Sequence, residues 1–410
     1  MVLVHAAQIF REKASRPSEW TVEVVTEYAD FVALEGPWNA LVERARIEHP
    51  FLRHEWLRTW WDCFGTGHRL HVLLVRHRDE VVAIAPLMLS SSRMYGFTVR
   101  QLEFIFNVHT PRMDVIIARC HREVYQTLWK YLGDRRGLWD VVEMHQLAEG
   151  SRTLEDLRAT AENTGYPAGV WKSDSSPYIC MEGMTAEEYF ASLGTKHRSN
   201  MRNRIKRLSK LGKVDMEVIH GERGLMTALE DGYAIEAAAW KGEASTAIRC
   251  EEPVRRFYTR IGQMAARLGW LRLQFLTLDG RRIAFGYSLV YERRHYLLKA
   301  GYDPAFAPYS PFNLLCERLI RNAFEEGLVE FDFLGADAEW KMRWTRTVRS
   351  HQWLFLFSRD ARARFLHWAK FRLAGVLRGR PLTRRLVEWA RGGPRVATAV
   401  SASLEEKELA

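Results

Sequence analysis

The chain has 410 residues, of which 47% are hydrophobic and 12% aromatic, so it can bury large cores and is not a disordered protein. At roughly 100–200 residues per domain, this length predicts two or three domains. The net charge of +10 favours an anionic partner such as nucleic acid, anionic lipid or a phosphate-rich cofactor. The five cysteines are scattered, and no uncharged apolar run reaches the roughly 18 residues of a membrane span. These features exclude a disulfide framework and a transmembrane helix, and we expect a cytoplasmic protein.

The hydrophobic pattern of the first half predicts one α/β unit at residues 21–180, after an N-terminal arm of residues 1–20. Strands are expected at 21–26, 70–77, 81–89, 99–106, 114–118 and 139–146. Helices are expected at 31–48, 55–64 and 122–132.

A similar order of elements recurs at residues 215–358, which we interpret as a second unit. Strands are expected at 215–220, 271–278, 282–291, 294–301, 329–334 and 351–357. Helices are expected at 223–241, 253–269 and 312–326. Asp279-Gly280 is the strongest hairpin signal in the chain. The sequence therefore predicts two α/β units in tandem.

Two basic segments flank the second unit. The connector, 181–214, contains the run K-H-R-S-N-M-R-N-R-I-K-R-L-S-K, whose seven basic residues and apolar spacing predict an amphipathic helix with a cationic face. Such a face is either simply solvated or contacts phosphates, a tRNA or lipid headgroups. The tail, 359–410, mixes Trp, Phe and Leu with Arg and Lys, a composition typical of interfacial helices. It either lies on an anionic membrane or packs on the second unit.

The segment from His295 to Gly335 reads as a strand, a turn-rich loop, an amphipathic helix and a second strand. A loop that opens a helix presents free backbone N–H groups at the positive end of the helix dipole, where an anion can bind. Ser310 is expected to cap this helix and Pro311 to occupy its first position. Taken alone, this pattern also describes an ordinary crossover helix.

The runs Y-L-L-K-A-G-Y-D-P-A-F-A and A-F-E-E-G-L-V-E-F-D-F-L-G resemble the second domain of the CelD-type (BioF2-like) acetyltransferases of the GNAT superfamily, which are related to the Fem-type peptidyltransferases. P-F-L-R-H-E-W-L-R-T-W-W followed by V-V-A-I-A-P-L-M-L resembles the opening of that family. The resemblance covers roughly residues 20–360. It implies an α/β (α+β) fold of tandem GNAT-like domains, each a mixed, mostly antiparallel sheet flanked by helices.

The resemblance also implies acyl-CoA as the donor, or aminoacyl-tRNA as in the Fem relatives, with no metal. The cofactor would lie on the loop and helix start, at Tyr302, Ser310, Phe312, Asn313 and Leu314. The family usually has a glycine directly after the Ser-Pro of this loop, where this chain has Phe312. Because glycine permits the closest backbone approach to a phosphate, Asn313 would have to compensate.

Acyl transfer needs a base, donors for the thioester oxyanion and an acid for the leaving thiolate. In the second unit the catalytic candidates are Glu236 and Asp332, and the substrate-binding candidates are Trp240, Lys241 and Lys341. Each of them is also compatible with a surface, core or salt-bridged position.

The first unit has a loop rich in polar side chains, N-V-H-T-P-R-M-D. His109 is the candidate general base, because an imidazole ordinarily titrates near neutrality. Asp114 would orient it as a second catalytic group, while Asn107 and Arg112 would bind the substrate. These groups would face the second unit across the cleft between the domains.

The leading functional hypothesis is acyl transfer from acyl-CoA to an amine or hydroxyl of a membrane- or envelope-related acceptor. The acceptor would be lipidic, such as a long-chain sphingoid-type amine, or a saccharide, such as an exopolysaccharide precursor. The enzyme would then lie at the cytoplasmic face of the inner membrane. The alternatives are Fem-like transfer from aminoacyl-tRNA and an inactive GNAT scaffold for envelope assembly; no DNA partner is expected.

Overall fold

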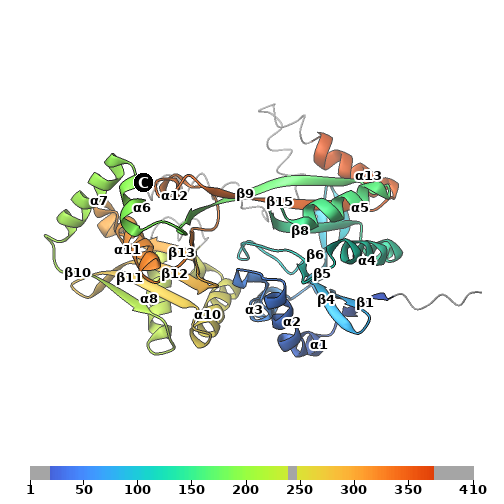
Figure 1. The fold of residues 1–410 in the computed structure, drawn as a ribbon, viewed down its shortest axis with the longest axis horizontal. Helices are drawn as coiled ribbons and strands as arrows, with labels where there is room; N and C mark the ends of the chain where they lie inside the picture. Colours follow the sequence, from blue (N-terminus) through green and yellow to red (C-terminus); the bar gives the residue numbers. More distant parts are fainter. Residues whose placement is uncertain (1–18, 239–246, 374–410) are drawn as a thin grey trace, which may run out of the picture.

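A computed structural model describes residues 19–238 and 247–373. Figure 1 shows two lobes: the first unit lies on the right, the second on the left, and strands β9 and β15 run between them. The strands form an 11-stranded sheet, in the order β10-β11-β12-β13-β14-β9-β15-β8-β6-β5-β2, and a four-stranded sheet, β1-β3-β4-β7. The expected mixed, mostly antiparallel α/β fold is confirmed. Among the described residues no helix is long and apolar enough to cross a bilayer.

The first unit contains strands β1 (Trp20–Val25), β2 (Arg69–Leu70), β3 (Val72–His77), β4 (Glu80–Ala85), β5 (Leu87–Met94), β6 (Phe97–Phe104), β7 (Ile116–Ile117), β8 (Val141–Ala148) and β9 (Ala168–Cys180). Its α-helices are α1 (Tyr28–Ala33), α2 (Glu35–Arg44), α3 (His54–Phe64), α4 (His121–Asp134) and α5 (Arg158–Asn163). Short helical turns η1 (Pro50–Leu52), η2 (Arg136–Leu138) and η3 (Thr153–Leu157) complete it.

The second half contains helices α6 (Ala186–Ser192), α7 (Thr195–Leu208), α8 (Leu225–Ala238), α10 (Glu252–Arg267), α11 (Pro311–Glu325), α12 (Glu339–Met342) and α13 (Ala361–Trp368). Its strands are β10 (Val214–Ile219), β11 (Leu271–Leu278), β12 (Arg281–Tyr291), β13 (Arg294–Tyr302), β14 (Glu330–Asp332) and β15 (Val348–Phe357). The short turns are η4 (Ile248–Cys250), η5 (Pro304–Tyr309) and η6 (Ala369–Leu373). The hairpin predicted at Asp279-Gly280 joins β11 and β12 and is confirmed.

Two prolines change the expected elements of the first unit. The helix expected at 31–48 is two helices, because Pro37 cannot donate to the carbonyl four residues earlier and its ring clashes there. The strand expected at 81–89 is likewise two strands separated by Pro86. Strand β4 belongs to the four-stranded sheet and β5 to the 11-stranded one. The chain therefore changes sheets at Pro86.

The two units exchange strands. In each unit a parallel pair is joined through a helix, β6–α4–β8 in the first and β13–α11–β14 in the second. The strand that follows each pair then leaves its own unit: β9 pairs with β14 of the second unit, and β15 pairs with β8 of the first. Strands β9 and β15 also pair with each other, so the 11-stranded sheet is continuous across both lobes.

The units also share a hydrophobic core. The Phe51 ring lies 5.5 Å from that of Tyr296, and the Trp56 ring 5.4 Å from that of Phe257, both in edge-to-face contact. All four side chains are buried. Buried aromatic contacts of this kind stabilise an interface by about 1 kcal/mol each beyond the area that they bury, so the two lobes are held in one arrangement.

Candidate functional site

Strands β13 and β14 run parallel for only three positions and then separate. The last paired position joins Tyr296 to Asp332, after which Phe333 donates its N–H to Pro177 of β9, at 3.0 Å. The register of β13 against β12 shifts at Leu298, which marks a β-bulge just past the separation. An elongated ligand can reach the centre of a sheet where parallel strands part, because the facing backbone groups there are not used for pairing.

The loop after β13 leads directly into α11. The side chain of Asp303 caps the turn η5, accepting from Ala305 N at 3.0 Å. Ser310 stands before α11, but its backbone is left-handed, with φ of 46°, and its side chain caps nothing. The expected side-chain cap is therefore wrong, because η5 runs directly into α11 and turns Ser310 away. The first turn of α11 keeps its positive end without an acidic or hydroxyl cap.

Three of the expected cofactor residues are buried. Phe312 packs edge-to-face on Trp340, with ring centroids 5.3 Å apart, and Asn313 and Leu314 are also buried. Tyr302 and Ser310 are half-buried on the loop itself. A ligand at this helix start would thus contact backbone and loop rather than the side chains of Phe312 and Leu314.

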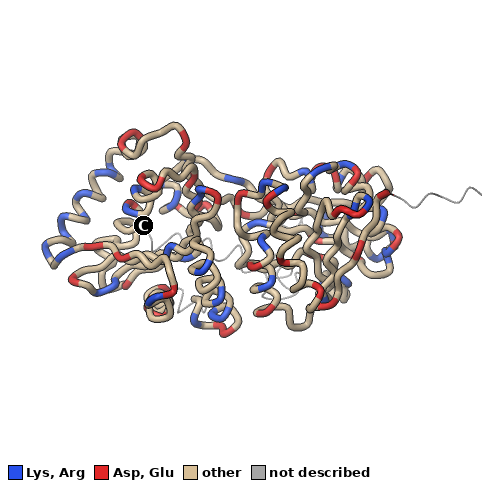
Figure 2. Tube along the Cα trace, turned by 60° about the horizontal axis from the view of Figure 1, so that its bottom comes forward, with Lys and Arg blue, Asp and Glu red and all other residues tan. Residues whose placement is uncertain are grey.

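The basic helix predicted in the connector is α7, and it packs against η5 and α11. Its apolar face is buried through Met201 and Leu208. Arg207 lies over the Tyr309 ring, with its guanidinium carbon 5.2 Å from the centroid. Figure 2 shows basic residues following one another along α7. A hollow of about 440 Å³ on this face is lined by Asn200, Asn203, Arg204, Lys206, Arg207 and Lys210.

The positive charges along α7 affect the pKa of one of its own arginines. The pKa of Arg204 is lowered by burial and by the neighbouring charges of Arg343 and Arg207. Like charges held this close are destabilising unless an anion joins them. An anion is therefore favoured on α7, and Arg207 brings this charge close to Tyr309, just before α11 begins.

His109 reaches the second unit, as the sequence predicted. Its Nδ1 lies 3.3 Å from the hydroxyl of Tyr258 on α10, and its ring stacks on Phe64. The ammonium of Lys299, next to the bulge in β13, lies 5.0 Å from the centroid of the Tyr258 ring. Burial, helped by the charge of Lys299, lowers the pKa of His109 to about 3. The expectation that this imidazole titrates near neutrality is therefore wrong; it is neutral at physiological pH.

Glu236 lies near the end of α8, beside β13. Its side chain is fully buried, and Oε2 accepts from Ile248 N at 3.0 Å. Gly301 of β13 lies so close that a Cβ there would be 2.7 Å from the Cα of Glu236. The other two expected residues of this region, Trp240 and Lys241, lie outside the described residues.

The loop that carries His109 sends its other polar residues elsewhere. The Asn107 side chain accepts from His109 N at 3.0 Å and shapes the turn. Asp114 accepts from the Ser151 hydroxyl at 2.7 Å and from the Thr153 hydroxyl. Burial raises the pKa of Asp114. Asp114 is thus held by hydroxyl groups of its own unit, and in the described part of the chain no hydrogen bond joins it to His109.

Asp332 joins the two units through arginines. Its carboxylate, fully buried, accepts from Arg112 of the first unit and from Arg349 Nη1 at 2.7 Å. Arg349 also donates to both carboxylate oxygens of Glu330, at 3.2 and 2.8 Å. The sequence proposed Arg112 and Asp332 as site residues but not as partners of each other. In this structure the Asp332 carboxylate is bound to two guanidinium groups and acts as an ion-pair partner.

Lys341 orders the loop after β14. Its ammonium donates to the carbonyl oxygens of Leu334 at 2.7 Å and Ala336 at 2.8 Å. The residue is buried. Lys341 therefore supports the backbone that follows the separated strand.

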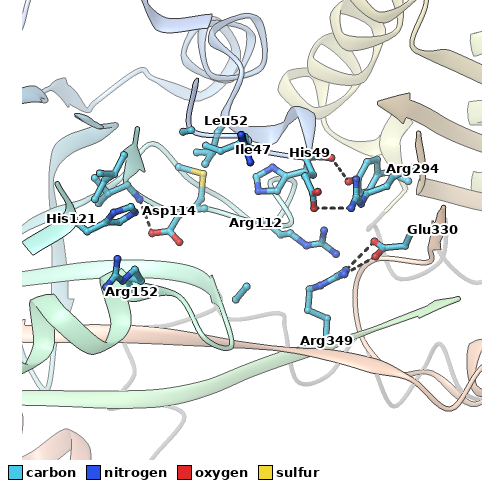
Figure 3. Close-up of a pocket in the computed structure, with 18 of the residues that line it drawn as sticks. Ile47, His49, Leu52, Arg112, Asp114, His121, Arg152, Arg294, Glu330 and Arg349 are labelled. Atoms are coloured by element: carbon cyan, nitrogen blue, oxygen red, sulfur yellow. Dashed lines mark hydrogen bonds and ion pairs between the residues drawn. The ribbon is translucent and has the colours of Figure 1, made fainter. Parts of the chain in front are cut away.

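A cavity of about 330 Å³ lies between the units (Figure 3). Its first-unit wall includes His49, Asp114 and His121, and its second-unit wall includes Arg294, Glu330 and Arg349, with Arg112 between the two walls. Five arginines and three carboxylates line it: Arg46, Arg112, Arg152, Arg294, Arg349, Glu48, Asp114 and Glu330. The sequence indicated only Arg112 and Asp114 of this set.

One group in the first unit has the composition of a metal site. Glu103 of β6 lies opposite Glu143 of β8, and His145 Nε2 is 3.3 Å from Glu143 and 3.8 Å from Glu103. The Gln101 amide donates to Glu143 at 2.7 Å. The available signal was Glu143-x-His145, since alternate residues of a strand share a face. These three residues were not among the site candidates predicted from the sequence.

Part of the second half matches a known domain family. The acetyltransferase (GNAT) domain family matches residues 195–342, which include α7 and the segment through α12. No curated protein sequence matches the chain.

Solved structures are similar over most of the chain. FemX is 13% identical, with 85% of this chain and 100% of that chain covered and a TM-score of 0.54. The L-PGS of Bacillus licheniformis is 14% identical, with 83% and 96% covered and a TM-score of 0.48. At such identities the likeness concerns the fold and not the activity. The chain therefore consists of two α/β units in tandem with the fold of FemX, and residues 195–342 match the acetyltransferase (GNAT) domain family.

Proposed function

We propose that the protein transfers an acyl group from acyl-CoA, bound by the second unit, to an amine or hydroxyl of a membrane- or envelope-related acceptor. The observation that carries this proposal is the position of α7, which packs against η5 and α11 and places Arg207 over Tyr309, just before α11 begins. The basic side chains of α7 and the N-terminus of α11 would both attract the negatively charged part of the donor. The same loop and helix connect β13 to β14, the two parallel strands that separate after Tyr296.

The donor would occupy these features in order. Its phosphates would lie at the N-terminus of α11, where the helix dipole and backbone N–H groups attract anions, with Lys206 and Arg207 of α7 beside them. Its thioester arm would extend between the separated strands, towards the bulge at Leu298. Phe312 at the helix start does not prevent this, because its side chain points into the core against Trp340.

The chemistry would take place where the first unit meets β13. The nucleophile attacks the thioester carbonyl, a new C–N or C–O bond forms, the C–S bond breaks, and a proton passes from the nucleophile to the leaving thiolate. His109 is unprotonated and its Nδ1 contacts the hydroxyl of Tyr258, so the two groups can relay a proton. Because the pKa of His109 is about 3 and burial raises the pKa of Tyr258, each would hold the transferred charge only in transit. We assign the proton transfers to this pair, with Glu236 lying nearby at the end of α8.

The donor assignment is tested by thermal shift and by titration with CoA, palmitoyl-CoA and tRNA. We expect both CoA compounds to stabilise the protein. Lys206→Glu should weaken CoA binding roughly tenfold, the effect of losing about one charge-assisted contact. Lys130→Glu is the matched control, because Lys130 is also an exposed helical lysine but lies on α4 of the first unit.

Two results would replace the proposal. Stabilisation by tRNA without stabilisation by CoA would identify an aminoacyl-tRNA donor, as in the Fem-like alternative. No response to CoA, palmitoyl-CoA or tRNA would favour the inactive scaffold. Stronger stabilisation by palmitoyl-CoA than by CoA would support a long-chain acyl group.

A further inference from the structure

One arginine of the cavity between the units has no ion pair among the described residues. The cavity lining contains five arginines and three carboxylates, and burial raises the pKa of one of these carboxylates, Asp114. Arg294 pairs with Glu48 at 2.8 Å, Arg349 with Glu330 at 2.8 Å, Arg152 with Asp156 at 3.7 Å, and Arg112 with Asp332. Arg46 is left without an ion pair among the described residues, and its positive charge attracts an anion from solvent.

Two buried nitrogen atoms at the cavity lack a partner. Arg112 is 6% exposed, and its Nε makes no hydrogen bond within the described residues. Nδ1 of His49, which also lines the cavity, likewise makes no hydrogen bond within the described residues. Burying an unsatisfied polar group costs roughly 1–3 kcal/mol, so an occupant that accepts these hydrogen bonds is favoured.

Arg46 adds a feature that is costly for the fold. It follows the last turn of α2 in a Schellman arrangement, in which Arg46 N bonds to Glu43 O at 3.0 Å and Ile47 N to Val42 O at 3.2 Å. The position requires a left-handed backbone, and Arg46 has φ of 53°. Glycine is the residue that normally occupies such a site without strain. An arginine here brings a guanidinium to the cavity at the expense of backbone strain, and no ion pair of Arg46 is found among the described residues.

The cavity also lies next to the point where strands β13 and β14 separate. Tyr296 lines it and forms the last paired position of β13 with Asp332. Arg112, which lines it as well, contacts Asp332 directly. A group bound in the cavity is therefore adjacent to the place proposed for the thioester arm.

We propose that this cavity binds an oxyanion, a phosphate or carboxylate carried by the acyl acceptor. Guanidinium groups suit both because they donate two parallel hydrogen bonds to such oxygens. The volume, about 330 Å³, fits a small polar headgroup and not a whole long-chain molecule. The acceptor assignment rests on the proposed acyltransferase function; anion binding itself does not.

The test is calorimetric titration of the full chain with inorganic phosphate, glycerol phosphate and succinate at constant ionic strength. Arg46→Gly removes a cavity charge while relieving the left-handed strain, so its melting temperature should equal or exceed that of the wild type. We expect it to bind the anion about tenfold more weakly, as for one lost charge-assisted contact. Arg78→Gly is the control, since Arg78 also has a positive φ, 56°, but lies in the β3–β4 turn and pairs with Glu19.

The outcomes separate this proposal from the donor site. Tighter binding of the phosphates identifies a phosphorylated acceptor, and tighter binding of succinate a carboxylate; both support the proposal. Absence of binding, or equal loss in Arg46→Gly and Arg78→Gly, overturns it. Loss in Lys206→Glu with none in Arg46→Gly would place the anion on α7 and also overturn it. Because the readout is anion binding, it holds or fails independently of the CoA titration.

Discussion

At the scale of single residues, the loop with His109 shows what a local sequence can and cannot reveal. A cluster of polar side chains between two strands was enough to indicate that the loop reaches the second unit, and His109 does so. The state of each group was not predictable, because it depends on neighbours distant in sequence. Tyr258 and Lys299 surround the imidazole, and burial holds its pKa at about 3.

We predict that His109→Gln lowers kcat by about 100-fold, the low end of general acid–base contributions, and leaves the melting temperature within a few degrees. The wild-type kcat/KM should show no ionisation of this histidine between pH 5 and 8, because its pKa lies far below that range. Steady-state kinetics across this range test both statements. Wild-type turnover in the variant would exclude His109 from the proton transfers.

Asp332 gives a second residue-scale prediction. Asp332→Asn keeps the shape but removes the charge that Arg112 and Arg349 share in the buried junction. Breaking a buried pair in this way costs about 3–5 kcal/mol, because it leaves an uncompensated charge. Urea unfolding measures the change.

The matched control is Glu339→Gln, from an exposed i, i+4 pair with Arg343, which should cost under about 0.5 kcal/mol. A comparably small loss for Asp332→Asn would mean that Asp332 does not hold the junction together.

At the scale of elements, regular hydrophobic patterns were predicted well and irregular ones were not. The hairpin at Asp279-Gly280 and helix α7 follow from spacing and turn chemistry. Strand β9 was missed, since W-K-S-D-S-S-P-Y-I-C has no clear alternation. Its pairing with both β14 and β15 stabilises it, and that information is distant in sequence. The division of the α13 apolar face into a buried and an exposed part was also not predictable, because it depends on residues distant in sequence.

Part of the α13 apolar surface is used for packing. Ala363 and Leu366 are buried against the first unit, while Phe365 and Trp368 are 45% and 47% exposed. Phe365 lies 6.1 Å from Phe97, centroid to centroid, and Trp368 lies 6.0 Å from Phe365. With Arg364 close by, this patch has the composition of a membrane-interface surface.

We predict that the double variant Phe365→Ser, Trp368→Ser reduces co-sedimentation with vesicles containing anionic phospholipid. Both side chains are exposed, so the fold should persist, whereas deleting the helix would also remove Leu366 from the core. Met226→Ser is the control, because Met226 is similarly exposed, at 46%, but lies on α8 of the second unit. Unchanged partitioning of the double variant would count against a membrane-bound acceptor.

At the scale of the whole molecule, neither the continuous sheet nor the common core could be predicted, because both depend on pairing between the halves. The repeat of element order was enough to predict tandem units. The exchange of β9 and β15 between the units could not be predicted from it.

The fold also encloses several histidines. Burial lowers the pKa of His71 and His351 to about 4 and of His295 to about 3, each from 6.5.

These histidines predict acid sensitivity. The unfolded chain binds their protons below pH 6.5 and the folded chain does not, so stability is complete above that pH and is lost as the pH falls towards 4 and then 3. Each extra proton bound by the unfolded chain contributes about 1.4 kcal/mol per pH unit. Melting temperatures from pH 7 to 4 test this, and His295→Gln should flatten the slope. An unchanged slope in that variant would contradict a neutral His295.

The exchange of strands also constrains how the chain is made. Strand β15, which completes the first unit's sheet beside β8, is synthesised after strands β10 to β14 of the second unit. Until residue 357 emerges, the first unit keeps an exposed strand edge, although its other elements were synthesised more than 170 residues earlier. During synthesis this unpaired edge is open to pairing with other chains, so folding of the first unit depends on the second half of the chain more than a repeat of two independent domains would suggest.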